Sequence, residues 1–240
     1  MQIVKENIVF LAVSIAITVA VYLCALLFQK IIERTSGRRF AGEKTKVNHL
    51  VILAMFTAIS VILMYVDFPL PFLAPSFYKI DFSEVPILIG AFMLGPCAGV
   101  IMEALKNLLM IVVKGTSTAF VGEFANFIIG CFFVVPAAIL YHFHRTKKRA
   151  IVSLIVGSAF MTAGGVLLNA VYLLPKYSQL YGMPVSSFIE MGSAINSGVN
   201  DIYSFAAICV GPFNLMKAGI VSIIVALLYP HLSRLLKGDH

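Results

Sequence analysis

The chain has 240 residues, of which 60% are hydrophobic and only 12% are charged, and its mean hydropathy is +0.96. Soluble globular domains carry about 25% charged residues, so this composition excludes a water-soluble domain and predicts an all-α polytopic membrane protein. The net charge of +7 indicates no nucleic-acid partner, because twelve of the 18 basic residues cluster beside apolar runs, as is typical of cytoplasmic loops. The three clusters are Lys30, Arg34, Arg38, Arg39, Lys44 and Lys46; Arg145, Lys147, Lys148 and Arg149; and Arg234 with Lys237.

The first apolar run covers residues 8–28 and is long enough to cross a bilayer. It differs from a secretory signal because its apolar part exceeds the usual length of about 7–15 residues and no small-x-small cleavage pattern follows. Lys5 and Glu6 also place opposite charges in front of it. We therefore expect a retained transmembrane helix within residues 1–28, followed by a basic cytoplasmic linker over residues 29–47.

Six further apolar segments follow within a membrane domain that we place at residues 48–240. Their ranges are about 49–66, 84–94, 96–113, 120–143, 150–175 and 202–234. The second segment is short and ends where Gly95 and Pro96 break the helix and permit a sharp turn. All three basic clusters face the cytoplasm if the N-terminus lies outside and the C-terminus inside, so we expect this topology in the plasma membrane.

Two connections have unusual compositions. Residues 68–86 read FPLPFLAPSFYKIDFSEVP, with four prolines and five aromatic residues, which fits neither a membrane helix nor an ordinary polar loop. Residues 176–200 are rich in Ser, Gly and Asn, which predicts an external loop with room for a short interfacial helix. Both connections fall on the outer side in the expected topology.

Polar residues inside apolar segments are costly and therefore informative. Glu103 and Lys106 stand at i and i+3, on one helix face, next to Asn107. This spacing predicts either an internal ion pair that tolerates burial or one wall of a polar cavity.

Two more i, i+3 pairs, Glu123 with Asn126 and Asn214 with Lys217, lie in the fourth and last of these segments. An asparagine offers donors and an acceptor. Two asparagines and a lysine together fit a planar heterocycle with an imide edge, or a chain of hydroxyls. Hydrogen bonds between helices are the alternative use of each asparagine.

The sequence contains no HExxH motif, no phosphate-binding glycine loop and no pairing of a nucleophile with a base. The four cysteines form no CxxC motif and have no neighbouring histidine, so neither a metal site nor a disulfide is expected. The chain offers groups for binding rather than for a reaction, and we expect no enzymatic activity.

Several motifs within residues 47–235 together resemble the riboflavin-specific substrate-binding subunits, or S components, of energy-coupling-factor (ECF) vitamin transporters. They are FPLPFLAPSFYKIDFSEVPILIGAFMLGPCAGVIMEALKNLL, then GEFANF and NLMK. The resemblance implies a six-helix core that captures riboflavin from outside and does not pump by itself. The helix at residues 8–28 is an addition to that six-helix pattern.

The resemblance also implies that residues 68–86, called the lid below, fold over the ligand, and the prolines limit the entropy lost on closing. Asp81 is expected to cap a helix that starts at Ser83. The lid aromatics expected to cover the isoalloxazine ring are Phe72, Phe77, Tyr78 and Phe82. The full set of expected ligand-binding residues is Phe72, Phe77, Tyr78, Lys79, Asp81, Glu123, Asn126, Asn214 and Lys217.

Ala54 and Ala58 form a small-xxx-small pattern, which permits close approach of another helix. In the resemblance this face docks on the transmembrane coupling subunit, and two ATPase subunits complete the importer. Riboflavin is then the transported ligand, and no cofactor is expected.

Three alternatives remain open at this point. Flavin mononucleotide is one, since Lys79 and Lys217 offer charges for a phosphate. The same fold serving thiamine or biotin is the second. The third is of another class, a non-transport membrane interaction protein or an intramembrane enzyme.

Overall fold

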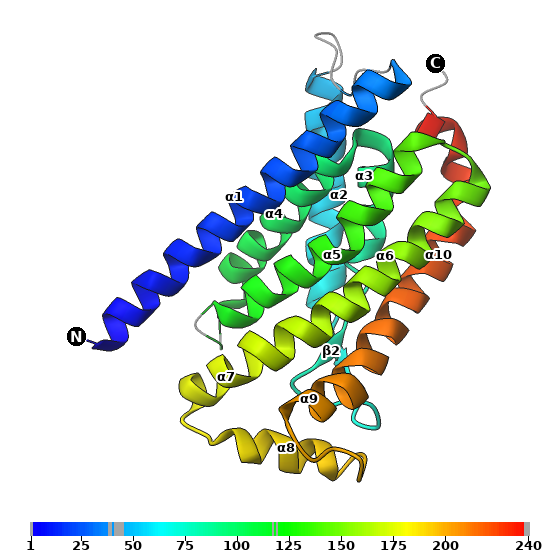
Figure 1. Cartoon of the computed structure of the whole chain (residues 1–240). Coiled ribbons are helices and arrows are strands. Elements are labelled where there is room, and N and C mark those ends of the chain that lie inside the picture. The colour runs from blue at the N-terminus through cyan, green and yellow to red at the C-terminus, as the bar shows by residue number, and fades with distance from the viewer. Residues whose placement is uncertain (1, 38–39, 41–45, 117, 119, 238–240) are drawn as a thin grey trace.

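A computed structural model describes residues 2–37, 40, 46–116, 118 and 120–237. The described chain is a helical bundle, which confirms the all-α prediction, and six of its helices are long and apolar enough to cross a membrane (Figure 1). In chain order the elements are α1 (Gln2–Ser36), α2 (Lys46–Tyr65), β1 (Phe68–Pro69), β2 (Lys79–Ile80), α3 (Glu84–Leu94), α4 (Pro96–Lys114), α5 (Val121–Phe143), α6 (Lys147–Leu168), η2 (Asn169–Leu173), α7 (Leu174–Tyr181), α8 (Val185–Ser193), α9 (Ile202–Phe205), η3 (Ala206–Val210) and α10 (Gly211–Lys237).

The short helix α3 is the centre of the bundle and is buried along almost its whole length. Its neighbours are α2, α4, α5 and α10, and its apolar side chains form the main core with those of α5, α6 and α10. The chain then reverses at Gly95, whose φ of 103° suits glycine, and Pro96 occupies the first turn of α4. The predicted break at Gly95–Pro96 is therefore confirmed.

Two transmembrane runs contain a π-helical segment. The segment η2 joins α6 to α7, so one helical run extends over Lys147–Tyr181, and η3 joins α9 to α10. Such segments insert an extra residue into a helix and are frequent at functional sites. The region predicted as an external loop, residues 176–200, begins inside α7 and contains α8, which lies at the same end of the molecule as the lid (Figure 1).

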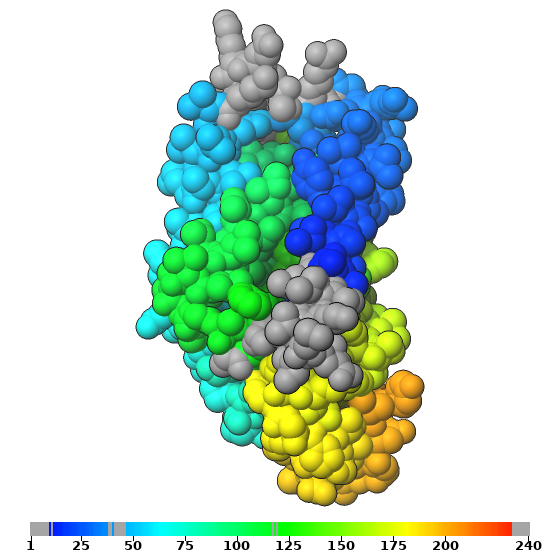
Figure 2. All heavy atoms as spheres, turned by 90° about the vertical axis from the view of Figure 1, so that its left-hand side faces the viewer, coloured from blue at the N-terminus to red at the C-terminus, as the bar shows by residue number. Residues whose placement is uncertain are grey.

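The additional helix α1 packs against α4 and α5, and it runs on to Ser36. Residues 29–36 of the predicted linker are thus helical, and residues 38–39 and 41–45 lie outside the described residues. At the end opposite the lid, Gln29 Oε1 accepts a hydrogen bond from the backbone N–H of Cys97 at 3.3 Å. Phe40 packs edge-on against the His142 ring, with 4.7 Å between centroids. Figure 2 shows the face of the bundle on which α1 lies beside α4.

The lid is ordered by a two-stranded antiparallel ladder that pairs Phe68 with Ile80 and Pro69 with Lys79. Asp67, just before β1, accepts hydrogen bonds from Lys79 at 3.2 Å and from Lys114, at the end of α4, at 2.9 Å. The lid and the N-terminal end of α1 lie at one end of the bundle, and the C-terminal end of α10 lies at the other (Figure 1).

Candidate ligand-binding site

A cavity of about 200 Å³, called the lid cavity below, lies between the lid and helices α3, α5, α6 and α10. It combines aromatic side chains with amides and charged groups, which is the mixture found in small-molecule sites. The residues that line it are Phe77, Tyr78, Lys79, Glu84, Thr118, Gly122, Ala125, Asn126, Ile129, Met161, Asn169, Leu173, Tyr177, Phe213, Asn214 and Lys217.

The lid contributes two aromatic rings to this cavity. The Phe77 ring meets the Phe188 ring of α8 edge-on, at 5.9 Å between centroids. The Tyr78 hydroxyl donates a hydrogen bond to Asn169 Oδ1, in the π-helical segment η2, at 2.6 Å. Burial, with smaller effects of Tyr177 and Cys209, raises the pKa of Tyr78 well above its ordinary value, so the hydroxyl stays protonated and able to donate.

Asparagine side chains supply the uncharged polar groups on the walls. Asn126 comes from α5, and its side chain forms no hydrogen bond with the described residues. Asn214, from α10, packs its amide nitrogen against the backbone of Gly165 in α6, and this buried nitrogen has no hydrogen-bond partner among the described residues. Unused donors and acceptors at a cavity are the groups that a polar ligand can satisfy.

Lys217, also on α10, brings a buried positive charge to the same wall. Its ammonium group lies 2.9 Å from Asp81 Oδ2 and 3.1 Å from Glu84 Oε1. An ammonium has three N–H donors, and these two contacts leave one for a ligand.

A second buried lysine extends the charge network away from the cavity. Lys106 Nζ lies 2.7 Å from Glu103 Oε2 and 3.4 Å from Glu84 Oε1, and it donates to Ser83 Oγ at 3.1 Å. The predicted i, i+3 ion pair of Glu103 with Lys106 is therefore confirmed. The alternative use of these two residues, as a cavity wall, is not observed, since neither lines the lid cavity.

Asp81 links the lid to this network. Burial raises the pKa of its carboxyl, but Lys217, Lys106 and a hydrogen bond from Ser83 together hold the pKa below the ordinary value. The carboxyl is therefore ionised at neutral pH, and its pairing with Lys217 is lost only as the pH falls through the lowered pKa. Asp81 Oδ1 also accepts the backbone N–H of Ser83 at 2.9 Å, just before α3 begins.

The structure separates the nine predicted ligand-binding residues into two groups. Those that line the lid cavity are Phe77, Tyr78, Lys79, Asn126, Asn214 and Lys217. Asp81 stands behind Lys217, Glu123 lines a different cavity between α1, α4 and α5, and Phe72 is 68% exposed on the lid surface. Phe82 likewise does not line the cavity but packs near Phe68, with 6.1 Å between ring centroids.

Sequence reasoning missed Glu84, Asn169, Tyr177 and Phe213 as lining residues. Asn169 is the omission with a usable signal, because an asparagine in the apolar run GGVLLNAVYLLP is as informative as Asn126. Glu84 stands in the lid sequence and is the first residue of α3, where an acid is easily interpreted as a contribution to the helix N-terminus.

Known proteins provide an independent comparison. The family model for the ECF transporter, substrate-specific component, matches residues 48–229. The riboflavin transporter FmnP of Bacillus subtilis (strain 168) is 35% identical over 185 residues, covering 77% of this chain and 91% of that protein. The riboflavin transporter RibU of Staphylococcus aureus (strain TCH60) is 34% identical over 203 residues, covering 84% and 98%.

A solved S component of a bacterial ECF transporter superposes with a TM-score of 0.63 at 35% identity and covers 80% of this chain and 99% of that chain. The helix α1 precedes the region matched by the family model, which starts at residue 48. The match spans the lid and every wall of the lid cavity. This chain belongs to the family of substrate-specific components of ECF transporters.

Proposed function

We propose that this protein captures riboflavin on the outer side of the membrane, in the lid cavity, and delivers it inward as the S component of an ECF importer. The observation that carries the proposal is the cavity itself, which has aromatic rings on its lid side and Asn126, Asn214 and Lys217 on its walls. The names of the relatives support the same ligand.

Riboflavin joins an apolar tricyclic ring with an imide edge to a chain of hydroxyls, and it is uncharged. The rings of Phe77 and Tyr78 offer faces and edges for stacking on such a ring system. The two asparagine amides and the remaining donor of Lys217 match the imide and the hydroxyls.

The charges around the cavity favour riboflavin over flavin mononucleotide. Both lysines at the cavity already have acidic partners, Lys79 with Asp67 and Lys217 with Asp81. Glu84 also lines the cavity, and its buried Oε2 has no hydrogen-bond partner among the described residues. A phosphate would meet an acid rather than an unpaired base here, which makes the alternative ligand unfavourable.

The remaining parts of the proposal concern topology and partners. The lid end faces outward, with the N-terminus outside and the C-terminus in the cytoplasm. Ala54 and Ala58 are exposed on α2, whose opposite face packs on α3 and α4, so this face is free for a transmembrane coupling subunit. Two ATPase subunits would drive release inward, and we propose no catalytic role for the chain itself.

A titration of the purified protein in detergent tests the ligand. We expect riboflavin to bind with strong quenching of its fluorescence, flavin mononucleotide to bind at least about tenfold more weakly, and thiamine and biotin not to compete. Tight binding of thiamine or biotin instead would reassign the substrate. Absence of binding by any of these compounds in well-folded protein would favour a membrane interaction protein that does not transport.

The Tyr78–Asn169 hydrogen bond is expected to limit access to the cavity. At about 200 Å³ the cavity is smaller than typical ligand pockets of about 300–1,000 Å³, so entry requires the lid to move. Removing the hydroxyl in Tyr78→Phe eliminates a hydrogen bond that stabilises the closed lid by about 0.5–1.5 kcal/mol. We expect riboflavin association, measured by stopped-flow quenching, to become about 2–10-fold faster.

Tyr181→Phe is the matched control, because Tyr181 is 47% exposed in α7 and lies outside the cavity. Its association rate should equal that of the unmodified protein. An unchanged rate in Tyr78→Phe would show that lid opening does not depend on this hydrogen bond.

A further inference from the structure

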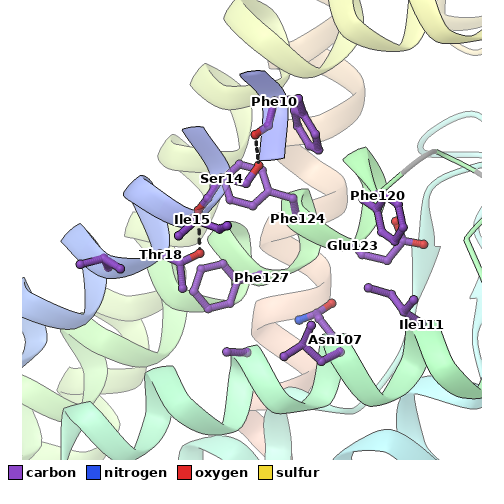
Figure 3. A pocket seen from close by; sticks show the side chains of 13 residues that line it. Phe10, Ser14, Ile15, Thr18, Asn107, Ile111, Phe120, Glu123, Phe124 and Phe127 are labelled. Atoms are coloured by element: carbon purple, nitrogen blue, oxygen red, sulfur yellow. Dashed lines mark hydrogen bonds between the residues drawn. The ribbon is translucent and has the colours of Figure 1, made fainter. Parts of the chain in front are cut away.

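A second cavity, of about 310 Å³, lies between α1, α4 and the first turns of α5 (Figure 3). We call it the lateral cavity. It is lined by Phe10, Ser14, Ile15, Thr18, Val19, Ala104, Asn107, Leu108, Ile111, Phe120, Glu123, Phe124 and Phe127. One whole wall comes from α1, which precedes the region matched by the family model, so the site is not part of the six-helix pattern.

Most of the surface of the lateral cavity is apolar. Phe10 of α1 meets Phe124 of α5 edge-on at 5.9 Å between centroids. The hydroxyls of Ser14 and Thr18 point along α1 and donate to backbone carbonyls one turn earlier, as the dashed lines in Figure 3 show. These two hydroxyls are therefore already satisfied, and α1 presents an essentially apolar wall.

Glu123 places an acid at one end of this apolar space (Figure 3). Its Oε2 accepts hydrogen bonds from the hydroxyls of Thr116 and Thr118, at 3.1 and 3.0 Å. Among the residues whose side chains the structure describes, no base lies within 4 Å of Glu123, and Lys114 is paired with Asp67 instead. Within the described side chains, Glu123 therefore has one carboxylate oxygen without a hydrogen-bond donor and no paired base.

The position of the lateral cavity indicates that its ligand comes from the lipid bilayer. Its margin is formed by exposed apolar residues of α1 and α4, with Ile15 64%, Val19 50% and Leu108 59% exposed, and in a membrane these face lipid. Glu123 stands in the first turn of α5, at the lid end, which is the depth of lipid headgroups. Toward Phe127 the cavity is apolar apart from Asn107, whose amide N–H donates to the backbone carbonyl of Glu103 at 2.8 Å.

We propose that the lateral cavity binds a phospholipid whose headgroup carries a primary amine, with the ammonium on Glu123 and an acyl chain along α1. A primary ammonium has N–H donors for the open carboxylate oxygen, which a choline headgroup lacks. The phenylalanine side chains and the apolar residues of α1 accommodate the acyl chain. This proposal is independent of riboflavin, and it gives the additional helix a role as one wall of a lipid site.

Native mass spectrometry of the full-length protein released from detergent tests this site. Phosphatidylethanolamine, phosphatidylcholine and phosphatidylglycerol with identical acyl chains are added separately at equal concentrations. We expect phosphatidylethanolamine adducts to exceed the other two about fivefold, and Glu123→Gln to remove that excess. Glu190→Gln, which alters an exposed acid of α8 at the same end, is the control and should keep it.

A second variant, Ala104→Phe, fills the apolar part of the lateral cavity and should reduce the adducts of all three lipids. Monodisperse elution in size-exclusion chromatography shows whether this variant is folded. Equal adducts of the three lipids in the unmodified protein, or an undiminished excess in Glu123→Gln, would overturn the proposal. If Ala104→Phe does not fold, the comparison of Glu123→Gln with Glu190→Gln decides alone.

Discussion

Replacing Lys217 by methionine is expected to lower the free energy of unfolding by about 3–5 kcal/mol and to weaken riboflavin binding at least about tenfold. The stability loss arises because Asp81, 3% exposed, would lose its ion-pair partner, and Glu84, 1% exposed, would keep only its contact with Lys106. Removing one partner of a buried ion pair leaves an uncompensated buried charge. The free-energy cost of that charge far exceeds the stabilisation that the pair provided. Thermal unfolding in detergent and riboflavin titration measure the two effects.

A double variant distinguishes the contribution of Lys217 to stability from its contact with the ligand. Adding Asp81→Asn to Lys217→Met removes the charge left unpaired, so most of the stability should return. Riboflavin affinity should not return, because the donor at the cavity is still missing. Recovery of affinity together with stability would show that Lys217 only supports the fold. Lys79→Met is a control for stability, since its pair with Asp67 is solvent-exposed and such pairs contribute about 0–1 kcal/mol.

The features that could be predicted from the sequence are those with local causes. Helix positions follow from uncharged apolar runs, and the reversal at Gly95–Pro96 follows from the conformational limits of those two residues. The Glu103–Lys106 pair is also local, because i and i+3 meet on any α-helix whatever surrounds it.

Glu123 and Asn126, which the sequence analysis assigns to one site, line two different cavities, and the reason is geometric. Residues three apart differ by about 60° around a helix, since each residue advances about 100°. The first turns of α5 stand between two cavities, and this angle is enough to turn Asn126 toward the lid cavity and Glu123 toward the lateral cavity. Only the packing of α1 on the other side of α5 reveals the second space.

Long-range partners could not be predicted for a similar reason. Asn169, the first residue of the π-helical segment η2, accepts its hydrogen bond from Tyr78, which lies 91 positions earlier in the chain. The neighbouring sequence predicts that Asp81 caps a helix, yet its strongest contact is with Lys217, 136 positions later in the chain. Local sequence specifies which groups are polar, whereas tertiary packing specifies which of them meet.

A single methyl group at Gly165 is expected to disable the site without unfolding the protein. A Cβ at this position of α6 would overlap the amide nitrogen of Asn214, so the side chain of Asn214 must move. Glycine to alanine within a helix adds up to about 1 kcal/mol of helix propensity, which offsets part of the strain. We therefore expect Gly165→Ala to keep nearly normal thermal stability and to lose riboflavin affinity at least about tenfold.

Gly219→Ala is the matched control for Gly165→Ala, because no described atom outside the local backbone of α10 lies within 4 Å of the added methyl. Its riboflavin affinity should be unchanged. The combination of Gly165→Ala with Asn214→Ala tests whether the glycine substitution acts through Asn214, since the effects of substitutions at residues in contact are not additive. If the glycine acts through Asn214, the double variant binds riboflavin no more weakly than Asn214→Ala alone. A further loss in the double variant would instead place Gly165 itself against the ligand.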